Sequence, residues 1–255
     1  VLLDDVLGPV SVRRVEGEIS DIDLTEQAVT VSTVDGQQTL FYDRVVFALG
    51  SQLFRPNIAG LAEHAFDVDT YSCAVKLNKH LQSLCSHPES PGQFTVVVVG
   101  AGLTGIETVC EMPGRLRTIL ARAGMTRSFS VILAGHNPLV GPDMGESARP
   151  VIEEALTALG VETRLGIDVV SINPTGITLR SGEEIPAATV VWCAGMRANP
   201  LTRLFSVEPE RFGRIPVDEF MRAKGVANVF AAGDVAIAMM DERHTTVMSC
   251  QHSRP

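Results

Sequence analysis

Three glycines at fixed spacing form the strongest chemical signal in the sequence. They lie in the run GAGLTG at 100–105, directly after the apolar run FTVVVV at 94–99. Gly100 permits a tight turn out of a strand, Gly102 lets a pyrophosphate approach the backbone, and Gly105 lets the next helix pack closely. The free N–H groups and the dipole of a helix N-terminus favour an anion there. Spacing and position predict a dinucleotide site, the alternative being an ordinary glycine-rich turn.

The next predicted strand lacks the acidic residue that usually ends it. In dinucleotide sites this carboxylate hydrogen-bonds the ribose 2′-hydroxyl group. Here the strand ends in Ala134, followed by Gly135, with no Asp or Glu at that point. Loss of the carboxylate removes repulsion against a 2′-phosphate, yet no arginine clearly replaces it, so the choice between NAD and NADP stays open. The basic candidates are His136, Arg122 and Arg127.

Two further patterns place functional groups at strand ends. Gly233 and Asp234 directly follow the apolar run at 228–232, and a carboxylate beside backbone N–H groups suits a polyol hydroxyl, such as that of a flavin ribitol chain. The alternative, a plain strand-to-turn Gly-Asp pair, is by itself the commoner case. The runs VVFALGS and VVWCAGM share a pattern, in which a predicted strand ends in a small residue that is followed by any residue and then by glycine. The two glycines are Gly50 and Gly195.

The order of apolar and amphipathic segments predicts the scaffold that positions these residues. Buried strands alternate with helices, which indicates a Rossmann-like, doubly wound α/β layer. A Pro113-Gly114 pair should kink or break the first of these helices. The expected strands are 94–99, 129–134, 161–165, 168–172, 176–180 and 189–193, the expected helices are 70–86, 103–123 and 146–159, and a β-meander is expected over 9–48.

Composition narrows the class of protein. The 255 residues are 45% hydrophobic and carry a net charge of −9, which indicates a folded chain and argues against nucleic acid as the main partner. Five widely spaced cysteines without a C-x-x-C motif predict neither a zinc site nor a disulfide framework, and they fit a cytoplasmic location. We expect Cys110 and Cys193 to be buried apolar residues rather than redox centres. No apolar run is long enough for a membrane-spanning helix.

In their order along the chain, four segments resemble the FAD-dependent pyridine nucleotide-disulfide oxidoreductase family. Within it, GAGLTGIETVCEM is most similar to type II NADH dehydrogenases, and SCQHSRP at 249–255 is similar to the start of a segment that closes near the flavin. The resemblance implies an NAD(P)-binding domain inserted in an FAD-binding domain with a β-meander. The four segments are the strand end at Gly50, GAGLTGIE at 100–107, CAGMRANP at 193–200, and GRIPVDEFMR with NVFAAGD between 213 and 234.

The resemblance also implies roles for single residues. Glu107, one turn into the helix, would lie between nicotinamide and flavin as the catalytic residue, the alternative being a solvent-exposed helix carboxylate. Gly233 and Asp234 would bind the FAD ribitol chain, with Gly50 near FAD. No metal ligand is implied. The residues implied to hold the nicotinamide dinucleotide are Gly100, Ala101, Gly102, Leu103, Thr104, Gly105, Gly135, Ala194 and Gly195.

The sequence departs from the family pattern at its N-terminal side. No β-α-β unit with its own glycine fingerprint precedes residue 40, so we interpret the chain as a truncated fragment that binds dinucleotide better than flavin and is inactive by itself. The predicted division is a partial FAD domain over 1–72, a hinge helix and linker over 73–92, an NAD(P)-binding domain over 93–200 and a further part of the FAD domain over 201–255.

The resemblance implies that the parent protein is a flavin-dependent NAD(P)H oxidoreductase, passing a hydride from nicotinamide to FAD and then electrons to a quinone or another acceptor. A disulfide reductase of the same family and a non-catalytic NAD(P)-sensing module are the alternatives. The electron acceptor, a homodimer and a peripheral membrane contact of the full-length protein stay open.

Overall fold

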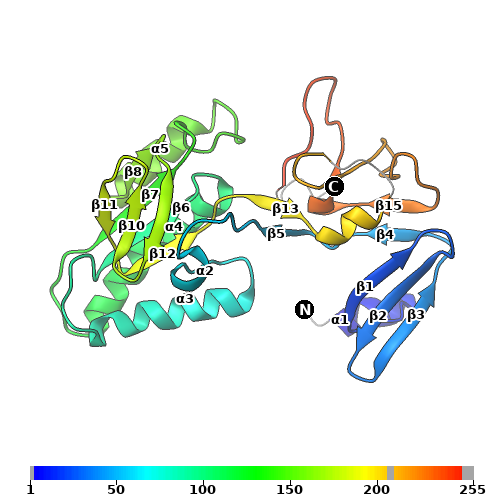
Figure 1. The fold of residues 1–255 in the computed structure, drawn as a ribbon, viewed down its shortest axis with the longest axis horizontal. Coiled ribbons are helices and arrows are strands. Elements are labelled where there is room, and N and C mark those ends of the chain that lie inside the picture. The colour runs from blue at the N-terminus through cyan, green and yellow to red at the C-terminus, as the bar shows by residue number, and fades with distance from the viewer. Residues whose placement is uncertain (1–2, 206–209, 249–255) are drawn as a thin grey trace. The chain divides into compact units, whose positions relative to one another are not determined.

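The chain folds as two units, each with its own hydrophobic core, in a computed structural model that describes residues 3–205 and 210–248 (Figure 1). One unit joins the chain up to Ser51 with the chain from Arg197 onward, and the other spans Gln52–Met196. The chain therefore crosses between the units after Ser51 and again after Met196. The segment 249–255, for which a place near a flavin was expected, lies outside the described residues.

A four-stranded parallel sheet is the centre of the unit Gln52–Met196. Its strand order is β12-β6-β7-β8, and the pairing places Val99 opposite Ala134 on one side and Trp192 on the other. Strands β6, β7 and β12 are nearly continuous apolar runs because both faces of the sheet are covered there, whereas the edge strand β8 has the sequence ETRL and is partly exposed. Their bounds are Thr95–Val99 for β6, Ser130–Gly135 for β7, Glu162–Leu165 for β8 and Thr189–Trp192 for β12.

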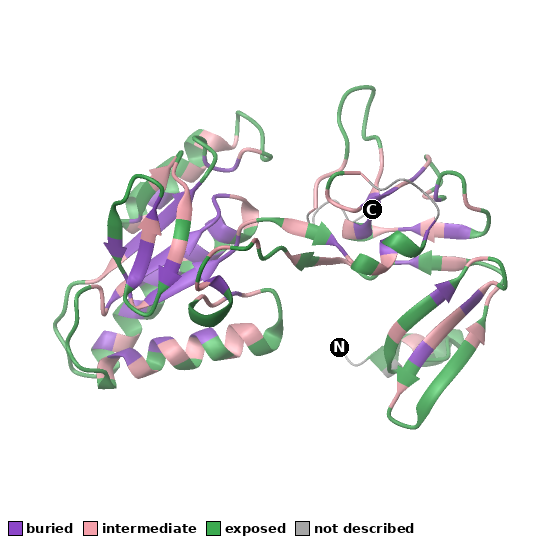
Figure 2. Cartoon of the chain, in the orientation of Figure 1, coloured by how far each residue is buried: buried purple, intermediate pink, exposed green. Residues whose placement is uncertain are grey.

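The two faces of this sheet are covered by different layers. Val96 and Val98 of β6 share a core with three helices, whereas Val97 and Val99 face a three-stranded antiparallel sheet and a short helix. Figure 2 shows the parallel strands between these layers as a buried centre. The predicted Rossmann-type α/β class is confirmed. The covering elements are α3 (Tyr71–Ser83), α4 (Leu103–Arg122) and α5 (Arg149–Leu159) on one face, and β9 (Val169–Asn173), β10 (Gly176–Leu179), β11 (Glu184–Pro186) and α2 (Leu61–His64) on the other.

Helix α4 runs unbroken past Pro113, so of the kink or break predicted at Pro113-Gly114 the break is wrong. A proline inside a helix removes one hydrogen bond and costs about 3 kcal/mol. Here Val109, Met112 and Leu116, on both sides of the proline, are buried in the core beneath α4. Their packing against the sheet offsets the lost hydrogen bond.

The segment between Gln52 and the predicted start of the NAD(P) domain packs in the same unit. The N–H of Phe66 donates to the carbonyl of Val190 at 2.8 Å, and the N–H of Trp192 donates to the carbonyl of Phe66 at 2.7 Å. Leu77 and Leu81, in the helix expected to act as a hinge, are buried in the core of the sheet. The unit therefore begins about forty residues before the predicted 93, because this segment covers an edge and a face of the sheet.

The other unit combines an antiparallel meander with short parallel pairs. The meander begins at Glu18 rather than at residue 9, because the preceding residues form the short helix α1 (Leu3–Leu7) and a turn of 3₁₀ helix (Gly8–Val10). Strands β4 and β15 pair in parallel, with Val45 opposite Val229. The strands are β1 (Glu18–Asp23), β2 (Ala28–Thr33), β3 (Gly36–Phe41), β4 (Val45–Phe47), β14 (Ile215–Pro216), β15 (Val229–Ala231) and β16 (Ala236–Ile237), and β5 (Ser51–Leu53) pairs with β13 (Met196–Ala198) at the two chain crossings.

Candidate functional site

The glycine-rich loop joins the carboxyl end of β6 to the N-terminus of α4. Gly100 has a φ of +122°, and a Cβ added there would lie 2.7 Å from the carbonyl carbon of Cys193. A Cβ added to Gly105 would lie 1.7 Å from the carbonyl oxygen of Gly100. Helix and strand thus meet backbone to backbone, and the fold itself requires glycine at both positions.

Gly102 has a different environment. It is the N-cap residue of α4, with an extended backbone (φ −85°, ψ −175°) that any residue can adopt. Apart from Gly102 itself and its two neighbours in the chain, no protein atom lies within 4 Å of a Cβ added there. Packing therefore gives no reason for glycine at this position. The open space lies at the helix N-terminus, where an anion is favoured, so the absence of a side chain leaves room for a ligand to approach the backbone.

The end of β12 lies beside the same loop. The N–H of Cys193 donates to the carbonyl of Val99 at 2.8 Å, and the Cα of Ala194 would lie 2.9 Å from a Cβ on Gly100. Gly195 has a φ of +82°, and its carbonyl accepts the N–H of Phe54 at 2.8 Å. The structure therefore brings the loop 100–105 and the predicted site residues at 194–195 together at the carboxyl edge of the sheet.

The thiol of Cys193 is buried behind this loop. Its Sγ donates to the hydroxyl oxygen of Thr108 at 3.8 Å. Burial raises the pKa of the Cys193 thiol to about 11. It therefore stays protonated at neutral pH, which agrees with the predicted core role.

His136 directly follows the end of β7, and the carboxylate of Asp168, from a loop later in the chain, lies beside it. Gly135 is buried, and a Cβ added there would lie 2.9 Å from the Cβ of Ala101, so close packing on the glycine-rich loop explains it. The Nδ1 of His136 lies 2.5 Å from Oδ1 of Asp168, and the Nε of Arg180 donates to Oδ2 at 2.8 Å. The hydrogen bonds from Arg180 and His136 lower the pKa of Asp168. No motif in the sequence pointed to Asp168.

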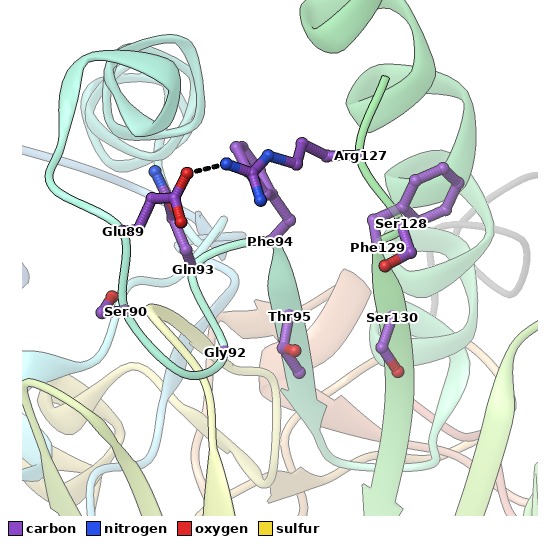
Figure 3. Close-up of a pocket in the computed structure, with 10 residues that line it drawn as sticks. All are labelled: Glu89, Ser90, Gly92, Gln93, Phe94, Thr95, Arg127, Ser128, Phe129 and Ser130. Atoms are coloured by element: carbon purple, nitrogen blue, oxygen red, sulfur yellow. Dashed lines mark ion pairs between the residues drawn. The ribbon is translucent and has the colours of Figure 1, made fainter. Parts of the chain in front are cut away.

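Two of the three basic candidates for a ribose phosphate lie at the opposite edge of the sheet. Arg127 precedes β7 and lines a cavity of about 310 Å³ at the amino ends of β6 and β7, where it forms an ion pair with Glu89 (Figure 3). Arg122 is the last residue of α4, which starts at the carboxyl edge and returns toward the amino edge. Of the three candidates, His136 alone lies at the edge that holds the loop 100–105.

Glu107 lies on the side of α4 that faces α3. Its side chain is exposed, and it lines a groove of about 460 Å³ together with Val68, Leu77 and Met112. Its role beside a nicotinamide stays a prediction.

In the other unit, the ends of β4 and β15 bring together the predicted flavin-site residues. Gly50 follows β4 with a φ of +68°, and Gly233 and Asp234 follow β15 in a turn of 3₁₀ helix. The hydroxyl of Ser51 donates to Oδ2 of Asp234 at 2.6 Å. Ser51 was not predicted as a site residue, although its position directly after Gly50 was a signal that could have found it.

Within residues 3–205 and 210–248, no group of three or more His, Cys, Asp and Glu side chains is placed to hold a metal ion. Nor does any helix in these ranges have the length and apolar character needed to cross a membrane.

Comparison with known proteins gives a family and several relatives. A family model described as pyridine nucleotide-disulphide oxidoreductase matches residues 9–254. The chain is 55% identical over 254 residues to an NADH dehydrogenase-like protein of Mycobacterium tuberculosis, covering 99% of this chain and 62% of that protein. It is 32% identical over 244 residues to a type II NADH:quinone oxidoreductase of the same species, covering 88% of this chain and 52% of that protein.

Among solved structures, NDH2 from Plasmodium falciparum in complex with NADH matches with a TM-score of 0.73 at 18% identity. The match covers 88% of this chain and 50% of that one. The chain thus spans less than two thirds of the length of each of these relatives.

Proposed function

The chain belongs to the pyridine nucleotide-disulphide oxidoreductase family, and on that basis we propose that its parent protein is an FAD-dependent NAD(P)H oxidoreductase. In this proposal the unit Gln52–Met196 binds the nicotinamide dinucleotide, and the other unit is part of the FAD-binding domain. The observation that carries the proposal is Gly102. Its open space at the N-terminus of α4 is what a pyrophosphate requires, and nothing in the protein's own packing accounts for it.

The residues of both units fit the two cofactors. The first N–H groups of α4 and the backbone at 194–195 offer a cradle for a dinucleotide at the carboxyl edge of the parallel sheet. Asp234, oriented by Ser51, offers an ionisable carboxylate that suits a ribitol hydroxyl. The sequence holds no second G-x-G-x-x-G run, so this chain provides no matching fingerprint for the ADP half of FAD.

The cofactors, when bound, would supply the hydride chemistry, and the chain's residues would bind and orient them. We propose that Glu107 lies beside the nicotinamide, because it is exposed one turn into α4, the helix that the glycine-rich loop opens. A quinone is the proposed electron acceptor, supported by the 32% identity to a type II NADH:quinone oxidoreductase.

The proposal is tested on the purified full-length parent protein. It should show flavin absorbance, and NADH should bleach the flavin band under anaerobic conditions. A soluble quinone should then restore the oxidised spectrum faster than a disulfide does, whereas a faster reaction with the disulfide would favour the disulfide reductase. Absence of flavin would refute the proposal, and NADH binding without bleaching would support the sensing module instead.

Two substitutions separate the two cofactor sites. Ser51→Ala should lower FAD occupancy because Asp234 loses its orienting hydroxyl, while leaving NAD⁺ binding intact. Glu107→Gln should slow reduction of the flavin by NADH while leaving FAD occupancy unchanged, and unchanged kinetics would return Glu107 to the role of a solvent-exposed helix carboxylate.

A further inference from the structure

The carboxyl end of β7 is the place where a dinucleotide site normally has its ribose carboxylate. β7 ends at Gly135, and Ala134, the residue before it, pairs with Val99, the last residue of β6. The N–H of Gly100 donates to the carbonyl of Ala134 at 2.7 Å, so this strand end lies directly beside the glycine-rich loop. Neither Ala134 nor Gly135 can supply the usual carboxylate, because Gly135 has no side chain and Ala134 is fully buried.

The loop between β8 and β9 brings a carboxylate to the same strand end. The N–H of Ile167 donates to the carbonyl of Gly135 at 3.0 Å, and the N–H of Gly166 donates to that of Asn137 at 3.2 Å. Asp168 is the next residue in this loop, and its side chain reaches His136 at 2.5 Å. These backbone hydrogen bonds therefore hold Asp168 beside Gly135 and His136, at the strand end that lacks the usual acid.

Asp168 keeps capacity for a further hydrogen bond. One of its carboxylate oxygens contacts His136 and the other accepts from Arg180, and each oxygen has a second lone pair. The side chain of Asp168 is one third exposed, so a ligand can reach it.

The charges around Asp168 do not form a phosphate site. His136 and Arg180 face it directly, and Arg180 is already paired with it. The neighbouring Arg164, on β8, is paired with Glu162 and Glu183. Both arginines are therefore already paired with carboxylates, which leaves neither of them unpaired for the additional charge of a 2′-phosphate.

We propose that Asp168 replaces the missing strand-end carboxylate, accepting a hydrogen bond from the adenosine ribose 2′-hydroxyl of NAD(H) and disfavouring NADP(H). Asp168 is then the specificity-determining residue, and His136 and Arg180 are positioning residues that hold its carboxylate. This inference rests on the proposed function, since it needs a dinucleotide at the loop 100–105.

The test is isothermal calorimetry of NAD⁺ and NADP⁺ on the full-length parent protein. The wild type should bind NAD⁺ more tightly. Asp168→Asn keeps the shape of the side chain and removes its charge, so it should shift the ratio of the two affinities toward NADP⁺ by about tenfold or more, the effect of one charged hydrogen bond. Glu154→Gln, which removes an exposed charge on α5, is the matched control and should leave the ratio unchanged.

A second variant tests whether the positive charge beside Asp168 opposes the preference for NAD⁺. Arg180→Gln removes a positive charge from Asp168 and should shift the ratio further toward NAD⁺, a result that general loss of structure would not give. If His136 and Arg180 formed a phosphate site instead, the wild type would prefer NADP⁺, and this preference distinguishes the two arrangements because Arg180→Gln shifts the ratio toward NAD⁺ in both. Either that outcome or an unchanged ratio in Asp168→Asn would overturn the proposal.

Failure of this inference is distinguishable from failure of the proposed function. A folded wild-type protein that binds neither nucleotide would refute dinucleotide binding as a whole. Binding that Gly102→Val abolishes, with a ratio that Asp168→Asn does not alter, would refute the role of Asp168 alone.

Discussion

Substituting alanine at Gly102 and at Gly105 should have opposite consequences, although the two glycines lie in one loop. The added methyl group at Gly105 would lie 1.7 Å from the carbonyl oxygen of Gly100, where contacts below 3.0 Å essentially never occur. The helix must therefore move by roughly 1 Å or more, and such overpacking costs about 1–3 kcal/mol, occasionally more. The higher helix propensity of alanine returns about 1 kcal/mol of this.

At Gly102 the methyl group meets no protein atom within 4 Å and the backbone is already extended. The gain from a stiffer unfolded chain, about 0.4–1 kcal/mol, is offset by the poorer capping of alanine. The unfolding free energy of Gly102→Ala should therefore stay close to that of the wild type. Binding should suffer instead, with NAD⁺ affinity falling about tenfold or more, equivalent to about 1.4 kcal/mol.

The assay compares both variants with the wild-type full-length protein. Thermal melting followed by circular dichroism reports stability, with about 2–4 °C expected per kcal/mol for a domain of this size. Calorimetry with NAD⁺ reports binding. Wild-type affinity in Gly102→Ala, or wild-type stability in Gly105→Ala, would refute the separation between a glycine needed for ligand approach and a glycine needed for packing.

Three further predictions concern buried groups. Burial lowers the pKa of His80 from its ordinary 6.5, so on acidification the unfolded chain takes up this proton before the folded protein does. The unfolding free energy should therefore be highest above pH 6.5 and fall below it, and His80→Gln should reduce that fall in urea titrations. Cys193, with a pKa raised to about 11, should resist iodoacetamide at neutral pH while the partly exposed Cys73 reacts, as mass spectrometry would show; equal labelling would contradict its burial. Arg214 is buried and bonded to Glu210 and to the carbonyl of Thr246, so Arg214→Ala should cost about 3–5 kcal/mol in chemical denaturation, and a loss below about 1 kcal/mol would show that the ion pair is not needed.

The strands of the parallel sheet could be predicted because the residue pattern that specifies each of them is local in the sequence. Continuous apolar runs such as 94–99 and 129–134 fit a strand covered on both faces, and both became buried strands. The helix past Pro113 could not be predicted, because the packing that stabilises it comes from strands elsewhere in the chain. The same holds for the segment from Gln52, which joins the unit through hydrogen bonds to β12.

By itself the sequence determined the glycine-rich loop, its place between strand and helix, and the small residues at the ends of β4 and β12. These features depend on backbone conformation and close approach, which single residues specify. The tertiary structure decided which side chains meet. It brought the hydroxyl of Ser51 within hydrogen-bond distance of Asp234 and the carboxylate of Asp168 beside His136. It also placed Arg122 and Arg127 away from the edge of the sheet that holds the loop 100–105. Such pairs join positions far apart in the chain, and their contacts depend on strand order and loop pairing rather than on any local pattern.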